Sequence, residues 1–324
     1  MQDIATELGV SKMTVSKCFN NSEDISEETK QLILKKSEEM GYEYKRKVKY
    51  TVAVLFSEVY FAPNEKFYSG LYMRLQELEW ANNMKFSLFY VSRETERACA
   101  LNPGVEDNDG IMLLGQFSRK YVMSIQQRGI PMVCLDFHYR GIEVDSVVSD
   151  SFQSSYNLTA YLMELGHRRI TFVGNLNYTN SVNDRYLGYY KAVLEEGISQ
   201  EGGSRIDDRD ENGILEEFRL PEQMPTAFVC NNDHTAFLLI QQLKKKGYLV
   251  PEQISVAGFD DVLYSEISEP PITSVHVQRK FMAEQAVSLM KRRWSRPDVE
   301  ARTVTVGCTI RYRQSVAPAR QEAE

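Results

Sequence analysis

Four cations lie within five positions, at a junction between two differently patterned parts of the chain. They are Lys45, Arg46, Lys47 and Lys49. Clusters of this kind contact the phosphates of nucleic acids, although most charge runs are only solvated surface. The net charge of −7 argues against nucleic acid, but residues 1–50 hold nine basic and nine acidic residues, so the acidic excess lies elsewhere. A basic face on a small, neutral N-terminal unit is therefore compatible with phosphate binding.

Residue types used in catalysis and metal binding are present but lack their usual spacing. The five cysteines are scattered without a CxxC pair, and the four histidines form neither HxH nor HExxH. A disulfide framework, a zinc site and a catalytic metal centre are therefore not expected. Gly-x-Ser-x-Gly and Walker motifs are also missing from the sequence. We expect no cofactor, no metal and no enzymatic activity.

Length and composition predict a folded protein of two or three units. The 324 residues are 43% hydrophobic and 26% charged, and single cores rarely exceed about 300 residues. The longest apolar runs, such as TVAVLF and GIMLLG, are far shorter than the roughly 18 residues that span a bilayer. The N-terminus has no basic flank followed by an apolar core. We expect a cytoplasmic protein with no membrane partner.

The first forty residues carry the signals of three short helices. Apolar faces recur at Ile4, Ala5 and Leu8, then at Met13, Val15 and Phe19, and finally at Ile33, Leu34 and Met40. Gly9 and Ser11 separate the first two helices as a C-cap and an N-cap, and Ser26 begins the third. Two short helices joined by a tight turn predict a helix-turn-helix unit.

The segments DIATELGVSKMTVSKCFNN and ISEETKQLILKKSEEMGY resemble the headpiece of the LacI/GalR family of bacterial transcription regulators. In that family the second helix enters the major groove of an operator. The resemblance places five residues at the DNA: Lys12, Met13, Thr14, Ser16 and Lys17. Lys17 replaces the usual Arg, which predicts altered base discrimination because Arg brackets a guanine where Lys offers a point charge. The alternative is a three-helix unit that binds another protein.

From residue 51 the pattern changes to short apolar strands that alternate with amphipathic helices. The predicted strands are TVAVLF, FSLFYV, GIMLL, PMVCLDF, RRITFVGN, TAFVC and ISVAGF, and helical stretches such as SSYNLTAYLMELG lie between them. This alternation predicts α/β structure, with parallel sheets covered by helices on both faces. A reset of the pattern near Asp150 predicts two Rossmann-like subdomains that face each other across a cleft.

Six motifs along this second unit resemble the same family in order and spacing. They are GIPMVCLDF, ELGHRRITFVG, NDRYLGYYKAV, PTAFVCNNDHTA, VPEQISVAGFDD and PPITSV. The resemblance implies the fold of periplasmic sugar-binding proteins, with the chain crossing between subdomains near residues 149, 276 and 306. The expected units are a headpiece (1–44), a short basic linker (45–50) and an effector-binding and dimerisation domain (51–324). In the last, the N-subdomain takes 51–149 and 277–306, and the C-subdomain takes 150–276 and 307–318.

The resemblance also nominates residues that bind a small-molecule effector, a sugar or sugar derivative. They are Phe67, Tyr68, Asp136, Arg185, Asn232 and Asp260. Planar hydrogen-bonding groups and aromatic rings suit a polyhydroxylated ligand. Arg185 is expected to hold hydroxyls or a carboxylate, and Asp260 to accept from vicinal hydroxyls. Alternatives remain: the aromatics form core, Asp136 pairs with a cation, and Asp233 and Asp261 are helix caps or turn formers. The charged loop ISQEGGSRIDDRDENG is expected on the surface.

The junction departs from the family pattern. Relatives carry a hinge helix after the Gly-Tyr pair, with Pro-Asn and a Leu that inserts into the minor groove. Here only nine residues separate Tyr42 from Val52, and neither Pro-Asn nor Leu lies among them. We expect the hinge helix to be missing, DNA binding to be unusually salt-sensitive and operator bending to be slight. Because relatives have a few residues before the position of Met1, the true start is expected upstream.

The leading functional hypothesis is a sequence-specific, DNA-binding regulator, and on the resemblance a repressor. An effector closes the cleft, shifts the subdomains of a homodimer, and changes how two headpieces hold a two-fold, double-stranded DNA operator. The alternatives are a sugar-binding protein that feeds a transporter and a carbohydrate-active enzyme. The headpiece and the lack of an export signal disfavour the first alternative, and the lack of catalytic motifs disfavours the second.

Overall fold

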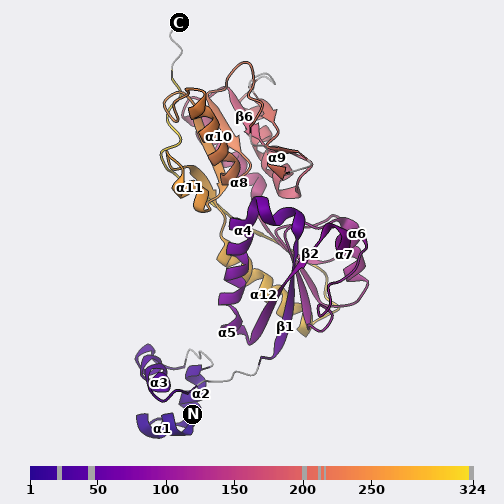
Figure 1. The fold of residues 1–324 in the computed structure, drawn as a ribbon, viewed down its shortest axis with the longest axis vertical. Coiled ribbons are helices and arrows are strands. Elements are labelled where there is room, and N and C mark those ends of the chain that lie inside the picture. Colours follow the sequence, from indigo (N-terminus) through magenta and orange to yellow (C-terminus); the bar gives the residue numbers. More distant parts are fainter. Residues whose placement is uncertain (20–23, 43–47, 199–202, 211–212, 215–216, 321–324) are drawn as a thin grey trace.

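The structure is a computed structural model that describes residues 1–19, 24–42, 48–198, 203–210, 213–214 and 217–320. Three parts follow one another along the long axis of the molecule (Figure 1): a helical headpiece and two α/β subdomains. Within the described residues, no helix is long and apolar enough to cross a bilayer.

The headpiece is a helix-turn-helix unit, as predicted. Its helices are α1 (Gln2–Leu8), α2 (Lys12–Phe19) and α3 (Glu27–Glu39). Gly9 ends α1 with φ 65°, a left-handed conformation that glycine adopts without strain. The Thr14 N–H donates to Ser11 Oγ at 3.0 Å, and the Thr29 N–H donates to Ser26 Oγ at 3.3 Å. These local bonds confirm the predicted caps.

The headpiece core contains fewer of the apolar residues than the sequence pattern predicted. Its buried cluster consists of Ile4, Ala5, Val15, Cys18, Phe19, Ile25 and Ile33. The prediction that Leu34 and Met40 are buried is wrong, since they are 47% and 40% exposed. Helix α3 buries Ile33 and Ser37, one turn apart, and residue 34 points about 100° away from residue 33. Met13 was also expected on an apolar face, and it is 69% exposed.

Two six-stranded sheets make up most of the remaining described chain. The N-subdomain sheet contains β1 (Tyr50–Ser57), β2 (Met84–Val91), β3 (Gly110–Leu114), β4 (Met132–Leu135), β5 (Asp145–Ser149) and β13 (Thr303–Val306). The C-subdomain sheet contains β6 (Ile170–Val173), β7 (Gly203–Ile206), β10 (Ala227–Cys230), β11 (Ser255–Asp260), β12 (Thr273–His276) and β14 (Thr309–Arg311). Their orders are β13-β5-β4-β3-β1-β2 and β14-β12-β11-β10-β6-β7. All pairs in these two sheets are parallel except β12 with β14. A separate antiparallel ribbon pairs β8 (Arg209–Asp210) with β9 (Gly213–Ile214).

Helices cover both faces of each sheet (Figure 1). The N-subdomain has α4 (Glu58–Glu77), α5 (Glu79–Asn82), α6 (Arg93–Arg97), α7 (Arg119–Gln126) and α12 (Arg279–Ser295), and the C-subdomain has α8 (Ser151–Glu164), α9 (Asn180–Glu195), α10 (Asp233–Lys245) and α11 (Leu263–Ile267). In β1, Val52 and Val54 pack into the cluster that includes α4 and α12, whereas Ala53 and Leu55 pack into the one that includes α7. A strand buried on both faces appears in sequence as a continuous apolar run. The predicted α/β class is confirmed.

The chain crosses between the two sheets three times. The crossings follow β5, β12 and β13, at residue 150, residues 277–278 and residues 307–308. In open parallel sheets, ligands bind beyond the carboxyl ends of the strands. Side chains that follow strands in either sheet are thereby brought to the space between the subdomains.

Candidate ligand cleft and nucleic-acid interface

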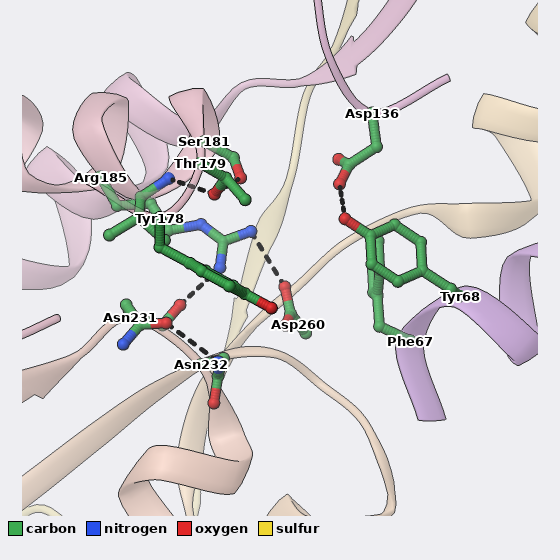
Figure 2. Close-up of a pocket in the computed structure, with 11 residues that line it drawn as sticks. Phe67, Tyr68, Asp136, Tyr178, Thr179, Ser181, Arg185, Asn231, Asn232 and Asp260 are labelled. Carbon is green, nitrogen blue, oxygen red and sulfur yellow. Dashed lines mark hydrogen bonds and ion pairs between the residues drawn. The ribbon is translucent and has the colours of Figure 1, made fainter. Parts of the chain in front are cut away.

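A cleft between the subdomains brings together all six residues nominated for ligand binding (Figure 2). Phe67 and Tyr68 lie within α4 and Asp136 follows β4, all on the N-subdomain side. On the C-subdomain side, Arg185 lies in α9, Asn232 precedes α10 and Asp260 ends β11. Sequence reasoning missed the remaining lining residues, which are Tyr178, Thr179, Ser181, Val182 and Asn231. Tyr178 and Thr179 precede α9, and Ser181 and Val182 lie in its first turn, directly before the NDRYLG motif that identified Arg185.

Arg185 is held by protein groups on every nitrogen of its guanidinium. Nη1 donates to the Asn231 carbonyl oxygen at 2.5 Å, Nη2 to Asp260 Oδ1 at 3.0 Å, and Nε to Ser151 Oγ at 3.4 Å. The guanidinium carbon lies 3.8 Å from the centroid of the Phe259 ring. Burial raises the pKa of Asp260, and the charge of Arg185 partly offsets this rise. The cleft therefore contains an ion pair rather than an isolated positive charge, which disfavours the expected capture of a carboxylate by Arg185.

Asp136 faces this pair from the N-subdomain. Tyr68 Oη donates to Asp136 Oδ2 at 3.0 Å, so the alternative of a cation partner for Asp136 is wrong. The other oxygen, Oδ1, is buried and has no hydrogen-bond partner among the described residues. Burial, with a smaller contribution from the charge of Asp260, raises the pKa of Asp136 to about 7. Near neutral pH this carboxyl group can either donate or accept a hydrogen bond.

Two cleft carboxylates sit on strained backbone. Asp136 has φ 76° and Asp260 has φ 99°. Non-glycine residues in this region cost about 1–3 kcal/mol and persist where surrounding structure enforces them, often at functional sites. One residue follows β4 and the other ends β11, so the two sheets present an acidic side chain to the cleft in the same way.

Asn232 has a structural bond in addition to its place in the cleft. Its Oδ1 accepts from the Thr235 N–H at 2.8 Å and so caps α10. Of the two roles suggested for Asp233, helix cap or turn former, the first is wrong, because Asn232 is the N-cap. Asp233 instead accepts from Ser274 Oγ at 2.6 Å and from the Val262 N–H at 2.8 Å. Burial raises its pKa well above the usual range. Asn232 caps α10, and Asp233 does not, because the Asp233 side chain is turned into the core.

Asp261, the other suggested cap, follows β11 and lies beside His276, the last residue before the crossing after β12. It has φ 52°, a conformation typical of turns, but its carboxylate caps no helix. Oδ2 lies 2.8 Å from His276 Nδ1, and Oδ1 accepts from Arg313 Nη2 at 2.6 Å. Burial opposes ionisation, but the bonds from Arg313 and His276 hold the pKa of Asp261 below its usual range.

The charged loop at 198–213 is not wholly on the surface, contrary to the prediction. Asp208 and Arg209 are 0% and 3% exposed, and they form a bidentate ion pair, in which Arg209 Nε donates to Oδ1 at 3.1 Å and Nη2 to Oδ2 at 2.6 Å. Asp208 also accepts from Asn231 Nδ2 at 2.8 Å and from Thr235 Oγ1 at 2.9 Å. Burial opposes ionisation, but these bonds hold the pKa of Asp208 below its usual range. The guanidinium carbon of Arg209 in turn lies 3.8 Å from the centroid of the Tyr178 ring. The Asp208–Arg209 pair thus contacts two residues that line the cleft, Asn231 and Tyr178.

The cleft is nearly closed. Its enclosed space is about 20 Å³, which holds about one water molecule. Sites for small molecules usually measure ~300–1,000 Å³. Entry of a sugar therefore requires the subdomains or the lining side chains to move apart.

The candidate nucleic-acid interface is α2. Five nominated residues lie on this helix: Lys12, Met13, Thr14, Ser16 and Lys17. Lys12 and Met13 are exposed at its start. Lys17 Nζ lies 3.0 Å from Asp24 Oδ2, so DNA contact by Lys17 competes with an ion pair inside the headpiece. The other nominated residues, Lys45, Arg46 and Lys47, lie outside the described residues.

Two family models match the chain. Residues 1–44 match bacterial regulatory proteins of the lacI family, and residues 159–316 match a periplasmic binding protein-like domain. Among curated proteins, the chain is 27% identical over 340 residues to the HTH-type transcriptional repressor PurR of Erwinia tasmaniensis, covering 98% of this chain and 96% of that one. The PurR repressor of Mannheimia succiniciproducens is 25% identical over 333 residues, with 98% of each chain covered.

Solved structures share the fold. A transcriptional regulator CelR–cellobiose complex aligns with a TM-score of 0.69 at 24% identity, covering 96% of this chain and 98% of that chain. A transcriptional regulator from Enterococcus faecium with bound ribose aligns with a TM-score of 0.70 at 21% identity, covering 83% and 100%. At this identity the likeness concerns architecture, which agrees with the two-sheet arrangement described above.

Proposed function

The chain belongs to the LacI family of bacterial regulatory proteins, and on this basis we propose that it is a transcriptional repressor whose hold on a DNA operator is set by a small molecule bound between its subdomains. Its curated relatives are repressors, not enzymes. We assign DNA contact to the headpiece (1–44), connection to the linker (45–50), and effector binding and dimerisation to residues 51–324.

One observation carries the effector part of the proposal. Asp136 presents a buried Oδ1, which has no hydrogen-bond partner in the part of the chain that the structure describes, to a cleft lined from both subdomains. A buried polar atom without a partner costs about 1–3 kcal/mol, and a ligand hydroxyl offers the missing bond. Asp260 lies across the cleft on the same kind of strained backbone (Figure 2). A ligand that joins these two carboxyl groups also joins the two subdomains.

The charges in the cleft favour an uncharged ligand. Arg185 is paired with Asp260, and Asp136 adds a second carboxyl group that is neutral or negative around pH 7. The net charge of these three groups is thus zero or −1, so these groups do not attract sugar phosphates or sugar acids. Phe67 and Tyr68 add an apolar wall. A neutral sugar or a similar hydroxyl-rich molecule fits best, and the solved relatives cited above contain ribose or cellobiose.

We include dimerisation in the proposal because two-fold operators are bound by two headpieces. A helix-turn-helix unit places one short helix in one half-site, and two-fold operators are read by two such units at a fixed spacing. We therefore expect a homodimer in which cleft closure changes the distance between the two headpieces.

A thermal-shift screen tests effector binding. A ligand at 100 times its Kd stabilises the folded state by about 2.7 kcal/mol, and we expect such a shift from a neutral sugar in a panel that includes ribose and cellobiose. Tyr68→Phe and Arg185→Ala should lose the shift. Tyr156→Phe is the matched control, because the Tyr156 hydroxyl bonds Glu195 outside the cleft. Shifts that survive both cleft substitutions would show that the ligand binds elsewhere.

Retention of DNA tests the repressor assignment. We expect salt-dependent, specific binding to duplex DNA from the region upstream of the protein's own gene. Binding that neither depends on salt nor responds to any ligand in the panel would reject regulation by this route.

A further inference from the structure

Where the linker joins the N-subdomain, an aromatic ring at the start of β1 stacks on a ring of α12. Tyr50 opens β1, and the Lys49 and Tyr50 N–H groups donate to the Asn83 carbonyl oxygen at 2.9 and 3.2 Å. The Tyr50 ring stacks on the Trp294 ring, with centroids 4.1 Å apart and planes 14° apart. Trp294 Nε1 donates to the Asp109 carbonyl oxygen at 2.8 Å. The last residues of the linker are therefore tied to the C-terminal end of α12.

The opposite end of α12 lies at the cleft. Helix α12 begins at Arg279, just after the crossing from β12. Arg279 Nη2 donates to the Asp261 carbonyl oxygen of the C-subdomain at 3.3 Å, next to the cleft residue Asp260. On α4, a Cβ at Gly70 would lie 2.8 Å from Arg279 Nη1. The missing side chain of Gly70 makes room for the guanidinium, and an added methyl group would have to move this flexible end of Arg279.

A single rigid element joins these two ends. Helix α12 has 17 residues, which corresponds to about 25 Å. It packs against α4, β4 and β5 and buries Met282, Ala286 and Met290. Because a packed helix moves as a body rather than deforming, a shift of the α12 backbone at Arg279 would move Trp294 as well.

We propose that Trp294 is a positioning residue that links the effector cleft to the DNA-binding headpiece: α12 transmits the position of Arg279 to the Tyr50–Trp294 stack, and this stack sets where the basic linker leaves the sensor. The inference rests on the proposed function. It provides a route by which the cleft controls headpiece spacing in a protein that we expect to lack the hinge helix.

A spectroscopic experiment tests the connection without any ligand. The chain has two tryptophans, so a Trp80→Phe background leaves Trp294 as the fluorophore. Gly70→Ala displaces the Arg279 guanidinium, which lies at the opposite end of α12 from Trp294, and we expect a changed Trp294 emission maximum and acrylamide quenching. Arg279→Lys should act in the same direction with less packing disturbance. Lys280→Ala, at an exposed neighbouring position, is the matched control. Unchanged Trp294 emission in Gly70→Ala and Arg279→Lys would overturn the proposal.

A double-mutant cycle tests the consequence for DNA. The probe is duplex DNA from upstream of the gene, with affinity measured by fluorescence anisotropy. Gly70→Ala should change the Kd by about 2- to 30-fold, the range of typical couplings. The change should vanish in a Trp294→Ala background and return with Trp294→Phe, which can still stack. An equal effect of Gly70→Ala in all backgrounds, or no effect in any, would reject the coupling. A protein that binds no DNA would reject the proposed function, whereas the fluorescence result would still decide the connection through α12.

Discussion

Replacing Asp136 with Asn should remove a specific pH dependence of folding stability. Burial raises the pKa of Asp136 from 3.8 to about 7 in the folded protein. Because the folded-state pKa is above the unfolded-state value, the contribution of Asp136 to stability is fully present below about pH 4. It is lost progressively as the pH rises from about 4 to about 7, because in this range the carboxyl group is ionised in the unfolded chain but still protonated in the folded protein. Asparagine is neutral throughout and still accepts a hydrogen bond from Tyr68 Oη.

The magnitude follows from the change in pKa. A rise from 3.8 to about 7, at about 1.4 kcal/mol per unit, means that ionised Asp136 costs ~4 kcal/mol relative to the protonated form. The free energy of unfolding of Asp136→Asn minus that of the parent should therefore grow by about 1.4 kcal/mol per pH unit between pH 4 and 7. Above pH 7 the difference should level off.

Urea unfolding followed by circular dichroism, at pH values from 4.5 to 8.5, measures this difference. Asp107→Asn is the matched control, because Asp107 is exposed and its replacement should leave the pH profile parallel to that of the parent. A constant difference between Asp136→Asn and the parent would refute the reasoning. It would mean that Asp136 ionises near pH 4 in the folded protein and that the cleft carries a full negative charge at neutral pH.

The remaining predictions concern other parts of the molecule. Asp24→Asn releases Lys17 from its ion pair and should tighten DNA binding by up to about five-fold, given 0.2–1 kcal/mol for an exposed pair. Lys17→Arg should alter base preference, and unchanged operator binding would contradict this. Operator bending measured by gel mobility should be slight and affinity steeply salt-dependent; a strongly bent operator with an inserted side chain would overturn both expectations. Asp145→Ala leaves Arg292 and Arg293 without their buried partner and should destabilise the protein by about 3–5 kcal/mol in urea unfolding, whereas a loss below 1 kcal/mol would show that solvent satisfies both arginines.

Local sequence signals were sufficient for the elements and for the location of the cleft. Gly9, Ser11 and Ser26 act on backbone groups within a few residues, so their roles are visible in the sequence. The strands appeared as apolar runs because both sheet faces are covered. Residues that follow strands of parallel sheets meet at one edge, which is why family motifs around Asp136 and Asp260 pointed to one place in space.

The identity of each buried partner, in contrast, depended on residues far apart in the chain. Asp208 and Arg209 lie in a stretch as charged as any surface loop, and they are buried because Asn231 and Thr235 meet them there. The pairing of Arg185 with Asp260 spans 75 positions, and it neutralises the charge of an arginine that had suggested an anion site. Burial and pairing are properties of the assembled packing, since desolvation and hydrogen bonding are set by all the groups that surround an atom, whatever their order in the sequence.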